Sequence, residues 1–332
     1  MNLKSIPKVE LHRHLEGSIR LSTLTELYHT VHKTKLSLLD AERKFQVKTP
    51  MKNLKEVIDK FMATQALLSS YEIIERITFE ACEDAFNEGI YLLELRYAPS
   101  FINIGRDLNF DKIHEAVIAG AKRAESQFKM AVGFIGIMVR SQPVKEAERA
   151  CDFFIDHKDT FCGVDLADQE LGFDCKTFSN VFLKAKKAGL RITCHSGEED
   201  VAEAPQFVRD SIDYCYAERI GHGLQIYKDP KTIEYVKQKG IYLELCPTSN
   251  VLTNSCKDIA SHPFAFLTKE GVLTTLNSDD PGVFGIDLTH EWHALLNTNS
   301  INLNDLKLAT HRAFTASFLP EVKKATVKQH YL

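Results

Sequence analysis

Two histidines with one residue between them, His12 and His14, lie in residues 8–17 (KVELHRHLEG). Val9 and Leu11 give this stretch the alternating apolar character of a short buried strand, in which residues two apart point to the same face. Two neutral imidazoles held side by side on a strand form two corners of a metal site, and zinc binds such nitrogens. The pair alone is also compatible with simple packing. The choice between a metal site and packing therefore depends on residues elsewhere in the chain.

Further polar residues follow predicted strands later in the chain. His195 follows the apolar residues 192–194, and Asp279 follows residues 272–278. Together with His12 and His14 they make a mixed nitrogen and oxygen ligand set that suits zinc, with iron or manganese as alternatives. A metal held in this way lowers the pKa of a bound water from 15.7 toward about 7 and supplies hydroxide at neutral pH.

Three more residues at the same predicted strand ends could act on a substrate. His222, in a Gly-His-Gly segment, could orient and deprotonate the water, and Glu198 could deliver a proton to the substrate. Asp280 either caps the following turn or points into the pocket. Each signal is weak alone. The prediction of a catalytic site depends on the common position of these residues at strand ends.

The elements that would position these residues form a regular pattern. Apolar runs typical of strands alternate with amphipathic segments typical of helices, which indicates parallel pairing with helical crossovers. After the first strand, strands are expected at residues 91–98, 131–139, 163–167, 191–195, 219–222, 241–246 and 272–278. Helices are expected between them at 111–127, 144–157, 177–188, 204–216, 230–239 and 263–269.

Eight such units predict an α/β fold, a (β/α)8 TIM barrel, whose catalytic groups lie at the carboxyl ends of the strands. The competing doubly wound sheet would carry a glycine-rich fingerprint after its first strand, and this sequence has none there. Without repeats or a low-complexity linker, residues 1–332 are expected to form a single domain.

Residues 18 to about 88 are mostly helical in pattern and are predicted to be a helical insertion after strand 1. Within them, residues 53–68 place an apolar stripe on one helix face, formed by Leu54, Val57, Ile58, Phe61 and Leu68. This helix either packs on the core or forms an apolar wall or lid over a pocket near the first strand.

The composition excludes several classes of protein. The 332 residues are 44% hydrophobic and 26% charged with a formal net charge of −4, which argues against a nucleic-acid or membrane-surface partner. Residues 1–7 lack the apolar region of a signal peptide, so a cytoplasmic location is expected. The eight cysteines form no Cys-x-x-Cys pair and are expected to be buried thiols. The oligomeric state is left open.

The segments that carry these residues resemble the metal-dependent adenosine deaminases. The main matches are residues 9–18 (VELHRHLEGS), 195–198 (HSGE), 219–223 (RIGHG) and 278–281 (SDDP). Support comes from residues 94–99 (ELRYAP), 163–167 (GVDLA) and 246–250 (CPTSN). The matches run in family order from residue 7 to about residue 285.

The resemblance implies one zinc ion on His12, His14, His195 and Asp279. It implies that the enzyme deaminates adenosine or 2′-deoxyadenosine to the inosine product and ammonia, as part of purine metabolism. Glu198 would protonate purine N1, and His222 would be the base beside the water that adds at C6. Asp280 would accept a hydrogen bond from the N7 side of the purine, and His14 also borders the substrate.

Two positions depart from the family pattern. Glu16 stands where many members have an aspartate that contacts the ribose, and Asp168 stands where the family usually has a glycine that offers its backbone N–H to purine N3. Both are expected to contact substrate. They leave adenine, an adenylate and aminofutalosine as alternative substrates.

Two other classes of function are also compatible with a metal site at the strand ends. One is a metal-dependent hydrolase of the same superfamily that attacks an ester or an amide. Its two-metal versions use a bridging carboxylated lysine on a central strand, and residues 131–139 and 163–167 contain no lysine. A zinc-holding protein without catalysis would need neither Glu198 nor His222. The sequence therefore favours a one-metal enzyme.

Overall fold

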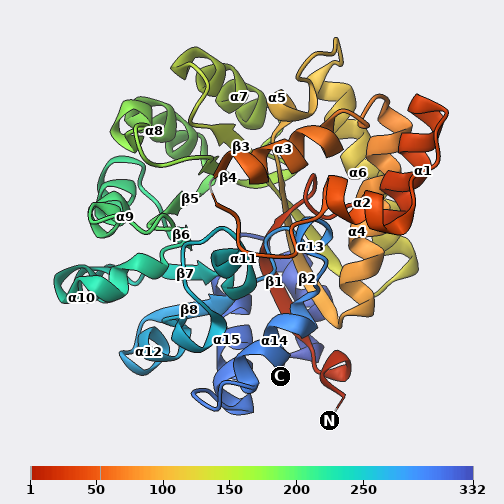
Figure 1. Ribbon diagram of the computed structural model, residues 1–332. Coiled ribbons are helices and arrows are strands. Elements are labelled where there is room, and N and C mark those ends of the chain that lie inside the picture. Colours follow the sequence, from red (N-terminus) through yellow and green to blue (C-terminus); the bar gives the residue numbers. More distant parts are fainter. Residues whose placement is uncertain (1, 53, 332) are drawn as a thin grey trace.

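The structure is a computed structural model that describes residues 2–52 and 54–331, and the side chains of residues 54 and 55 lie outside that description. An eight-stranded sheet lies at its centre, with the strands in the order β1 to β8 and every neighbouring pair parallel (Figure 1). The strands are β1 (Lys8–His14), β2 (Ile90–Tyr97), β3 (Ala131–Val139), β4 (Phe161–Ala167), β5 (Arg191–Ser196), β6 (Arg219–His222), β7 (Tyr242–Leu245) and β8 (Leu273–Leu276).

Helices surround the sheet and connect successive strands, which confirms the predicted (β/α)8 barrel (Figure 1). The helices that follow β2 to β7 are α5 (Pro99–Ile102), α6 (Phe110–Gln127), α7 (Val144–Asp156), α8 (Ser179–Ala188), α9 (Ala204–Tyr214), α10 (Pro230–Lys239), α11 (Pro247–Leu252) and α12 (Phe264–Lys269). After β8 come α13 (Pro281–Phe284), α14 (Leu288–Leu296), α15 (Leu303–Ala316) and α16 (Glu321–Val327).

Local signals set the ends of these elements close to the predicted positions. Helix α10 begins with Pro230 after Asp229, whose side chain accepts a hydrogen bond from the backbone of Lys231. It ends at Lys239 and is followed by Gly240, whose φ of 65° suits the left-handed conformation of a helix C-cap. Among the strands, the largest difference lies in the last one, which is predicted at 272–278 and spans Leu273–Leu276.

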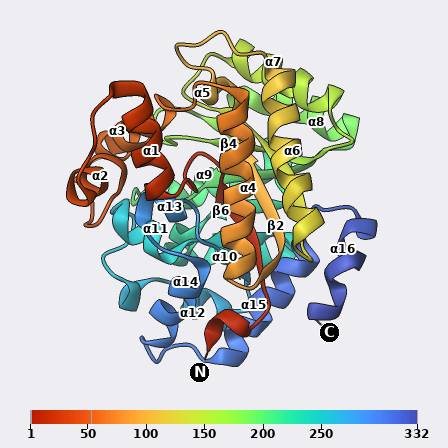
Figure 2. The ribbon, with the colours of Figure 1, turned by 90° about the vertical axis from the view of Figure 1, so that its right-hand side faces the viewer.

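The early helical segment consists of four helices, α1 (Leu21–His32), α2 (Leu38–Phe45), α3 (Leu54–Gln65) and α4 (Tyr71–Asn87). Helix α4 lies beside α6 on the outside of the barrel, so it is the crossover helix between β1 and β2 (Figure 2). The predicted insertion is therefore made of α1 to α3, which precede that crossover helix.

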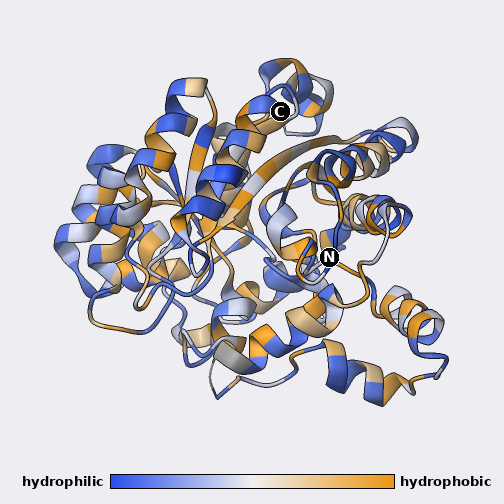
Figure 3. Ribbon diagram, turned by 90° about the horizontal axis from the view of Figure 1, so that it is seen from above, coloured by the Kyte–Doolittle hydropathy of each residue, from blue (hydrophilic) through white to orange (hydrophobic). Residues whose placement is uncertain are grey.

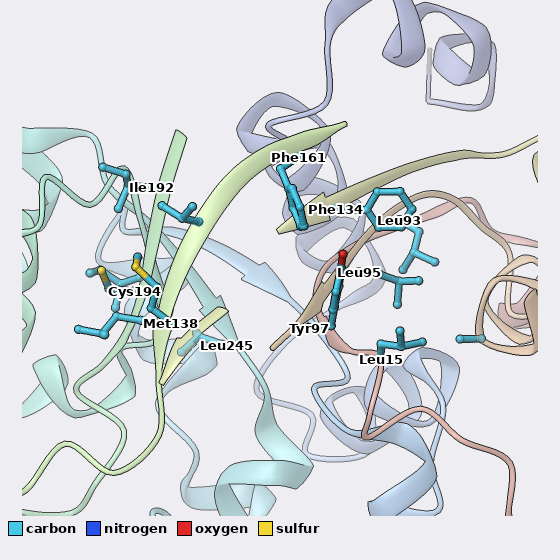
Figure 4. Packing of buried hydrophobic residues seen from close by; sticks show 14 of the residues in the cluster. Leu15, Leu93, Leu95, Tyr97, Phe134, Met138, Phe161, Ile192, Cys194 and Leu245 are labelled. Carbon is cyan, nitrogen blue, oxygen red and sulfur yellow. The ribbon is translucent and has the colours of Figure 1, made fainter. Parts of the chain in front are cut away.

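The apolar core lies between the strands and the outer helices. Figure 3 shows apolar positions along the central strands, whereas the outer helices alternate apolar and polar residues. Tyr97, Phe134 and Phe161 from three neighbouring strands pack together in one part of this layer, with the Tyr97 and Phe161 rings 5.7 Å apart (Figure 4). Aromatic and branched side chains of this kind bury enough apolar area to hold helices against the sheet.

The first and last strands meet at a seam that closes the barrel. The backbone N–H of Asp279 donates to the carbonyl of His12 at 2.9 Å, and the N–H of His14 donates to the carbonyl of Asp279 at 3.0 Å. The side chain of Asn277 accepts a hydrogen bond from the N–H of Leu11 at 3.1 Å. Asn277 and Asp279 therefore join the chain beyond the end of β8 to β1. Among the described residues, no helix is long and apolar enough to cross a membrane.

Candidate active site

Four side chains converge at the carboxyl ends of β1, β5 and β8. Nitrogens of His12, His14 and His195 and a carboxylate oxygen of Asp279 all lie within 4.8 Å of one another. The Nε2 atoms of His14 and His195 are 3.2 Å apart, and Asp279 Oδ1 lies 3.4 Å from His12 Nε2 and 3.3 Å from His14 Nε2. The structure thus brings together the four residues that the sequence predicts as metal ligands.

The chemistry of this donor set fits a divalent metal ion. His12 Nε2 is fully buried, and no described residue gives it a hydrogen-bond partner. An unpartnered buried ring nitrogen is costly unless it binds something else. Three imidazoles and one carboxylate around one point match the ligands that zinc prefers.

Buried carboxylates orient two of these histidines from behind. Glu244 Oε2 lies 2.8 Å from His12 Nδ1, and Asp165 Oδ2 lies 2.9 Å from His195 Nδ1. Each carboxylate accepts the hydrogen of Nδ1, which leaves Nε2 with a lone pair that faces the cluster. Arg96 bridges the two carboxylates, at 2.8 Å from Asp165 and 2.6 Å from Glu244.

These buried carboxylates stay charged because of their partners. Burial raises the pKa of Glu244, but the charges of Arg96 and Arg219 outweigh it and hold the pKa well below its ordinary value. Burial likewise opposes ionisation of Asp165, and the charges of His195 and Arg96 lower its pKa overall. The histidines therefore face carboxylate acceptors rather than neutral acids.

Glu198 and His222 lie next to the four convergent side chains. His222 Nε2 is 3.5 Å from Glu198 Oε2 and 3.8 Å from Asp279 Oδ2. Burial, together with the negative charge of Asp279, raises the pKa of Glu198 to about 8. A carboxyl group of this kind keeps its proton at neutral pH and can donate it, as a general acid requires.

A cavity of about 720 Å³ opens beside these groups. The predicted site residues that line it are His14, Glu16, Asp168, His195, Glu198, His222, Asp279 and Asp280, whereas His12 lies behind them. Among the described residues that line the cavity, none is a lysine or an arginine.

Two carboxyl groups in the cavity wall have oxygens that are free to bind a ligand. Glu16 Oε1 accepts the backbone N–H of Ala98 at 2.9 Å, while Oε2 is buried and has no partner among the described residues. Asp280 Oδ1 is likewise buried and unpartnered. Burial raises the pKa of Glu16 to about 7, and burial with the charge of Asp279 raises the pKa of Asp280 well above its usual range.

Asp168 adopts a backbone conformation that usually requires glycine, with φ at 89°. Its side chain accepts hydrogen bonds from the Ser141 hydroxyl and, at 2.8 Å, from the backbone N–H of Gln169. The chain therefore keeps a left-handed turn at this position, and these contacts tie the carboxylate to neighbouring loop residues.

Helix α3 contributes an apolar wall to the cavity. Val57, Ile58, Phe61 and Met62 line it, which confirms the wall interpretation of the predicted stripe. Leu68 lies beyond the end of α3 and is buried in the core. Residue 53 and the side chain of Leu54 lie outside the described part of the chain.

The residues that support the site are not among the site residues predicted from the sequence. Arg96 and Asp165 lie within residues 94–99 and 163–167, and Glu244 lies in a predicted strand. A charged residue inside an apolar strand must be paired when it is buried, and this was the signal that could have found them. Glu170 was also missed, and its carboxylate accepts the backbone N–H groups of Gly197 at 2.8 Å and Glu198 at 2.9 Å. That last signal was weak, because Glu170 follows a strand in a loop.

Comparisons with known proteins bear on this site. The sequence profile of the family described as "Adenosine deaminase" matches residues 7–330. The adenosine deaminase of Erwinia tasmaniensis is 34% identical over 327 residues, which cover 97% of this chain and 97% of that protein. The adenosine deaminase of Klebsiella pneumoniae is 33% identical over 327 residues, with coverage of 98% and 97%.

Solved structures share the same architecture. The N6-mAMP deaminase of Arabidopsis superposes with a TM-score of 0.86 at 28% identity, covering 99% of this chain and 98% of that one. The adenine deaminase of Arthrobacter aurescens superposes with a TM-score of 0.89 at 22% identity, covering 98% of each chain. At that identity the second likeness concerns the fold alone.

Substitution of Asp168 tests the left-handed backbone conformation at this position. We expect Asp168→Gly to be more stable than Asp168→Ala, because a left-handed conformation costs an alanine about 1–2 kcal/mol and costs glycine nothing comparable. Urea unfolding of the two variants measures the difference. At Asp152, inside helix α7, the same pair of substitutions should give the opposite order, because glycine costs a helix interior about 1 kcal/mol relative to alanine. Equal stability of the two residue-168 variants would contradict the left-handed turn.

Proposed function

The chain belongs to the adenosine deaminase family, a family of hydrolytic deaminases, and on that premise we propose that it deaminates adenosine and 2′-deoxyadenosine with one zinc ion. The products would be inosine or 2′-deoxyinosine and ammonia, as a step of purine metabolism. The observation that carries the proposal is the convergence of three histidines and Asp279 beside a buried, protonated Glu198.

The lining of the cavity supports a nucleoside rather than a nucleotide. The absence of lysine and arginine among the described lining residues leaves a phosphate without a counter-charge. The N6-mAMP deaminase of Arabidopsis is named for a nucleotide, which carries a phosphate. The lack of a cation in this cavity is therefore the observation that favours a nucleoside here. The unpartnered Oε2 of Glu16 would bind a ribose hydroxyl, which free adenine lacks.

The metal would be held by His12, His14, His195 and Asp279. A zinc ion there supplies hydroxide from water at neutral pH. One ion is proposed because the strands β3 and β4 contain no lysine that could bridge a second.

The chain's own residues would bind and protonate the purine. Glu198 would give its proton to N1, which makes C6 electrophilic, and His222 would face the water that adds at C6. N7 of adenosine carries a lone pair, so Asp280 in its protonated form would donate a hydrogen bond to it, rather than accept one as expected from the sequence. Asp168 would present its backbone N–H toward N3, as a glycine does, and His14 would border the sugar.

Three further expectations remain predictions. They are the single domain over residues 1–332, the cytoplasmic location, and the lack of a nucleic-acid or membrane partner.

A substrate panel tests the proposed function. Zinc-loaded protein is assayed by the change in ultraviolet absorbance with adenosine, 2′-deoxyadenosine, adenine, AMP, N6-methyl-AMP and aminofutalosine. We expect kcat/KM to be highest for the two nucleosides, because the cavity offers an oxygen for a ribose hydroxyl and no cation for a phosphate. Turnover of adenine or of a nucleotide alone would overturn the substrate assignment.

Replacing Glu198 tests the proton donor. Glu198→Gln keeps the size of the side chain but removes the acidic proton, so we expect kcat for adenosine to fall by about 100- to 10,000-fold. Zinc content, measured by atomic absorption, should stay the same. Glu203→Gln, an exposed neighbour in the same loop, serves as the matched control and should retain full activity. Unchanged turnover in Glu198→Gln would remove this residue from the mechanism.

Replacing Asp165 tests the support of the metal ligands. Asp165→Asn weakens the acceptor on His195 Nδ1, so we expect zinc affinity, measured by competition with a chelator, to fall by about 10- to 100-fold. Glu94→Gln is the control, because Glu94 is also a buried strand carboxylate paired with an arginine but contacts no ligand histidine. Equal losses of affinity in both variants would indicate a general structural effect instead.

A further inference from the structure

Behind His222, on the side away from the cavity, lies a short row of buried side chains. His222 Nδ1 is 3.1 Å from Asn250 Nδ2, and Asn250 Oδ1 is 3.1 Å from His262 Nε2. Asn250 lies in α11 and His262 just before α12, and all three side chains are buried. The row continues to the backbone N–H of Phe264, which donates to His262 Nδ1 at 3.2 Å.

The backbone N–H at Phe264 determines where the hydrogen of His262 lies. An N–H group can donate only to a nitrogen with a lone pair, so His262 Nδ1 carries no hydrogen. A neutral imidazole has one ring hydrogen, which must then be on Nε2. Burial lowers the pKa of His262 to about 3, so the ring is neutral at ordinary pH. His262 Nε2–H therefore donates to the side chain of Asn250.

The orientation of the Asn250 amide follows from that hydrogen. Its carbonyl oxygen must face His262, since the opposite orientation would set an NH2 group against Nε2–H. The amide nitrogen consequently faces His222 and donates to Nδ1. The same geometry disfavours a doubly protonated His222, whose Nδ1–H would meet the amide hydrogens of Asn250.

We propose that Asn250 and His262 are positioning residues that keep the ring hydrogen of His222 on Nε2, the nitrogen that faces the cavity. His222 then presents a hydrogen-bond donor to the attacking oxygen, whereas the sequence predicts a base at this position. A nitrogen that bears a hydrogen has no lone pair for the proton of the water. Because Glu198 and Asp280 already hold protons, that proton passes to Asp279 Oδ2, the carboxylate oxygen 3.8 Å from His222 Nε2. The part concerning the attacking oxygen rests on the proposed function, and the position of the hydrogen does not.

The substitution Asn250→Asp reverses the direction of the hydrogen bond between residue 250 and His222 Nδ1. A carboxylate oxygen in place of Nδ2 accepts a hydrogen bond, so the ring hydrogen of His222 moves to Nδ1 and leaves Nε2 bare. If Nε2–H acts as a donor, kcat for adenosine falls by about 100-fold, as for the loss of one donor to a developing oxyanion. KM should change by less than about threefold. An unchanged or higher kcat would overturn the donor role.

Nitrogen NMR of the zinc-loaded protein with 15N-labelled histidine reads the tautomer without reference to turnover. His222→Gln identifies the signals of residue 222 by their loss. We expect Nδ1 of His222 to have the shift of a bare ring nitrogen and Nε2 that of a protonated one, with the two exchanged in Asn250→Asp. The reverse assignment in the unaltered protein would overturn the proposal.

Two variants of His262 separate positioning from packing. His262→Gln can still donate from an amide near the place of Nε2 and should keep kcat within about threefold, whereas His262→Leu fills the space without a donor and should lower kcat. Equal effects of the two variants on kcat would overturn the role of His262. The expected NMR tautomer in a protein that deaminates no purine would contradict the proposed function while supporting the assigned hydrogen.

Discussion

The pairing of buried charges inside the barrel is the constraint on which the rest of the structure depends. Arg96 holds Asp165 and Glu244 together, and these two carboxylates hold the imidazoles of His195 and His12. Removing one partner of such a buried pair leaves an uncompensated charge, which typically costs about 3–5 kcal/mol. Fold stability and ligand orientation therefore depend on the same contacts, and neither can change without the other.

The candidate active site also lies on the seam where the barrel closes. The backbone hydrogen bonds that join β1 to the end of β8 connect His12, His14 and Asp279 directly, so closing the sheet places three of the four convergent side chains. Asp279 and His222 both have φ at 60°, a strained conformation for residues with a side chain. The surrounding strands hold these conformations in place, and the resulting rigidity favours catalysis that relies on fixed geometry.

The cavity combines acidic groups with an apolar wall, and burial determines which of the acids carry a proton. The raised pKa values of Glu198 and Asp280 make hydrogen-bond donors of two groups that would be acceptors in water. The row behind His222 likewise determines the position of a ring hydrogen. Under the proposed function, recognition of a neutral purine would depend on the positions of hydrogens as much as on those of the heavy atoms.

The sequence by itself determined the barrel, because hydrophobic periodicity and capping residues act over short distances along the chain. It also identified the convergent histidines and acids, since residues after parallel strands meet at one rim. Only the tertiary structure decided which buried charges pair, as for Arg96 and Glu244, which are 148 positions apart. The orientation of the Asn250 amide and the hydrogen bonds of the Asp168 carboxylate to Ser141 and Gln169 also follow from the tertiary structure alone. Such contacts depend on strand register and helix placement, which no local pattern of residues encodes.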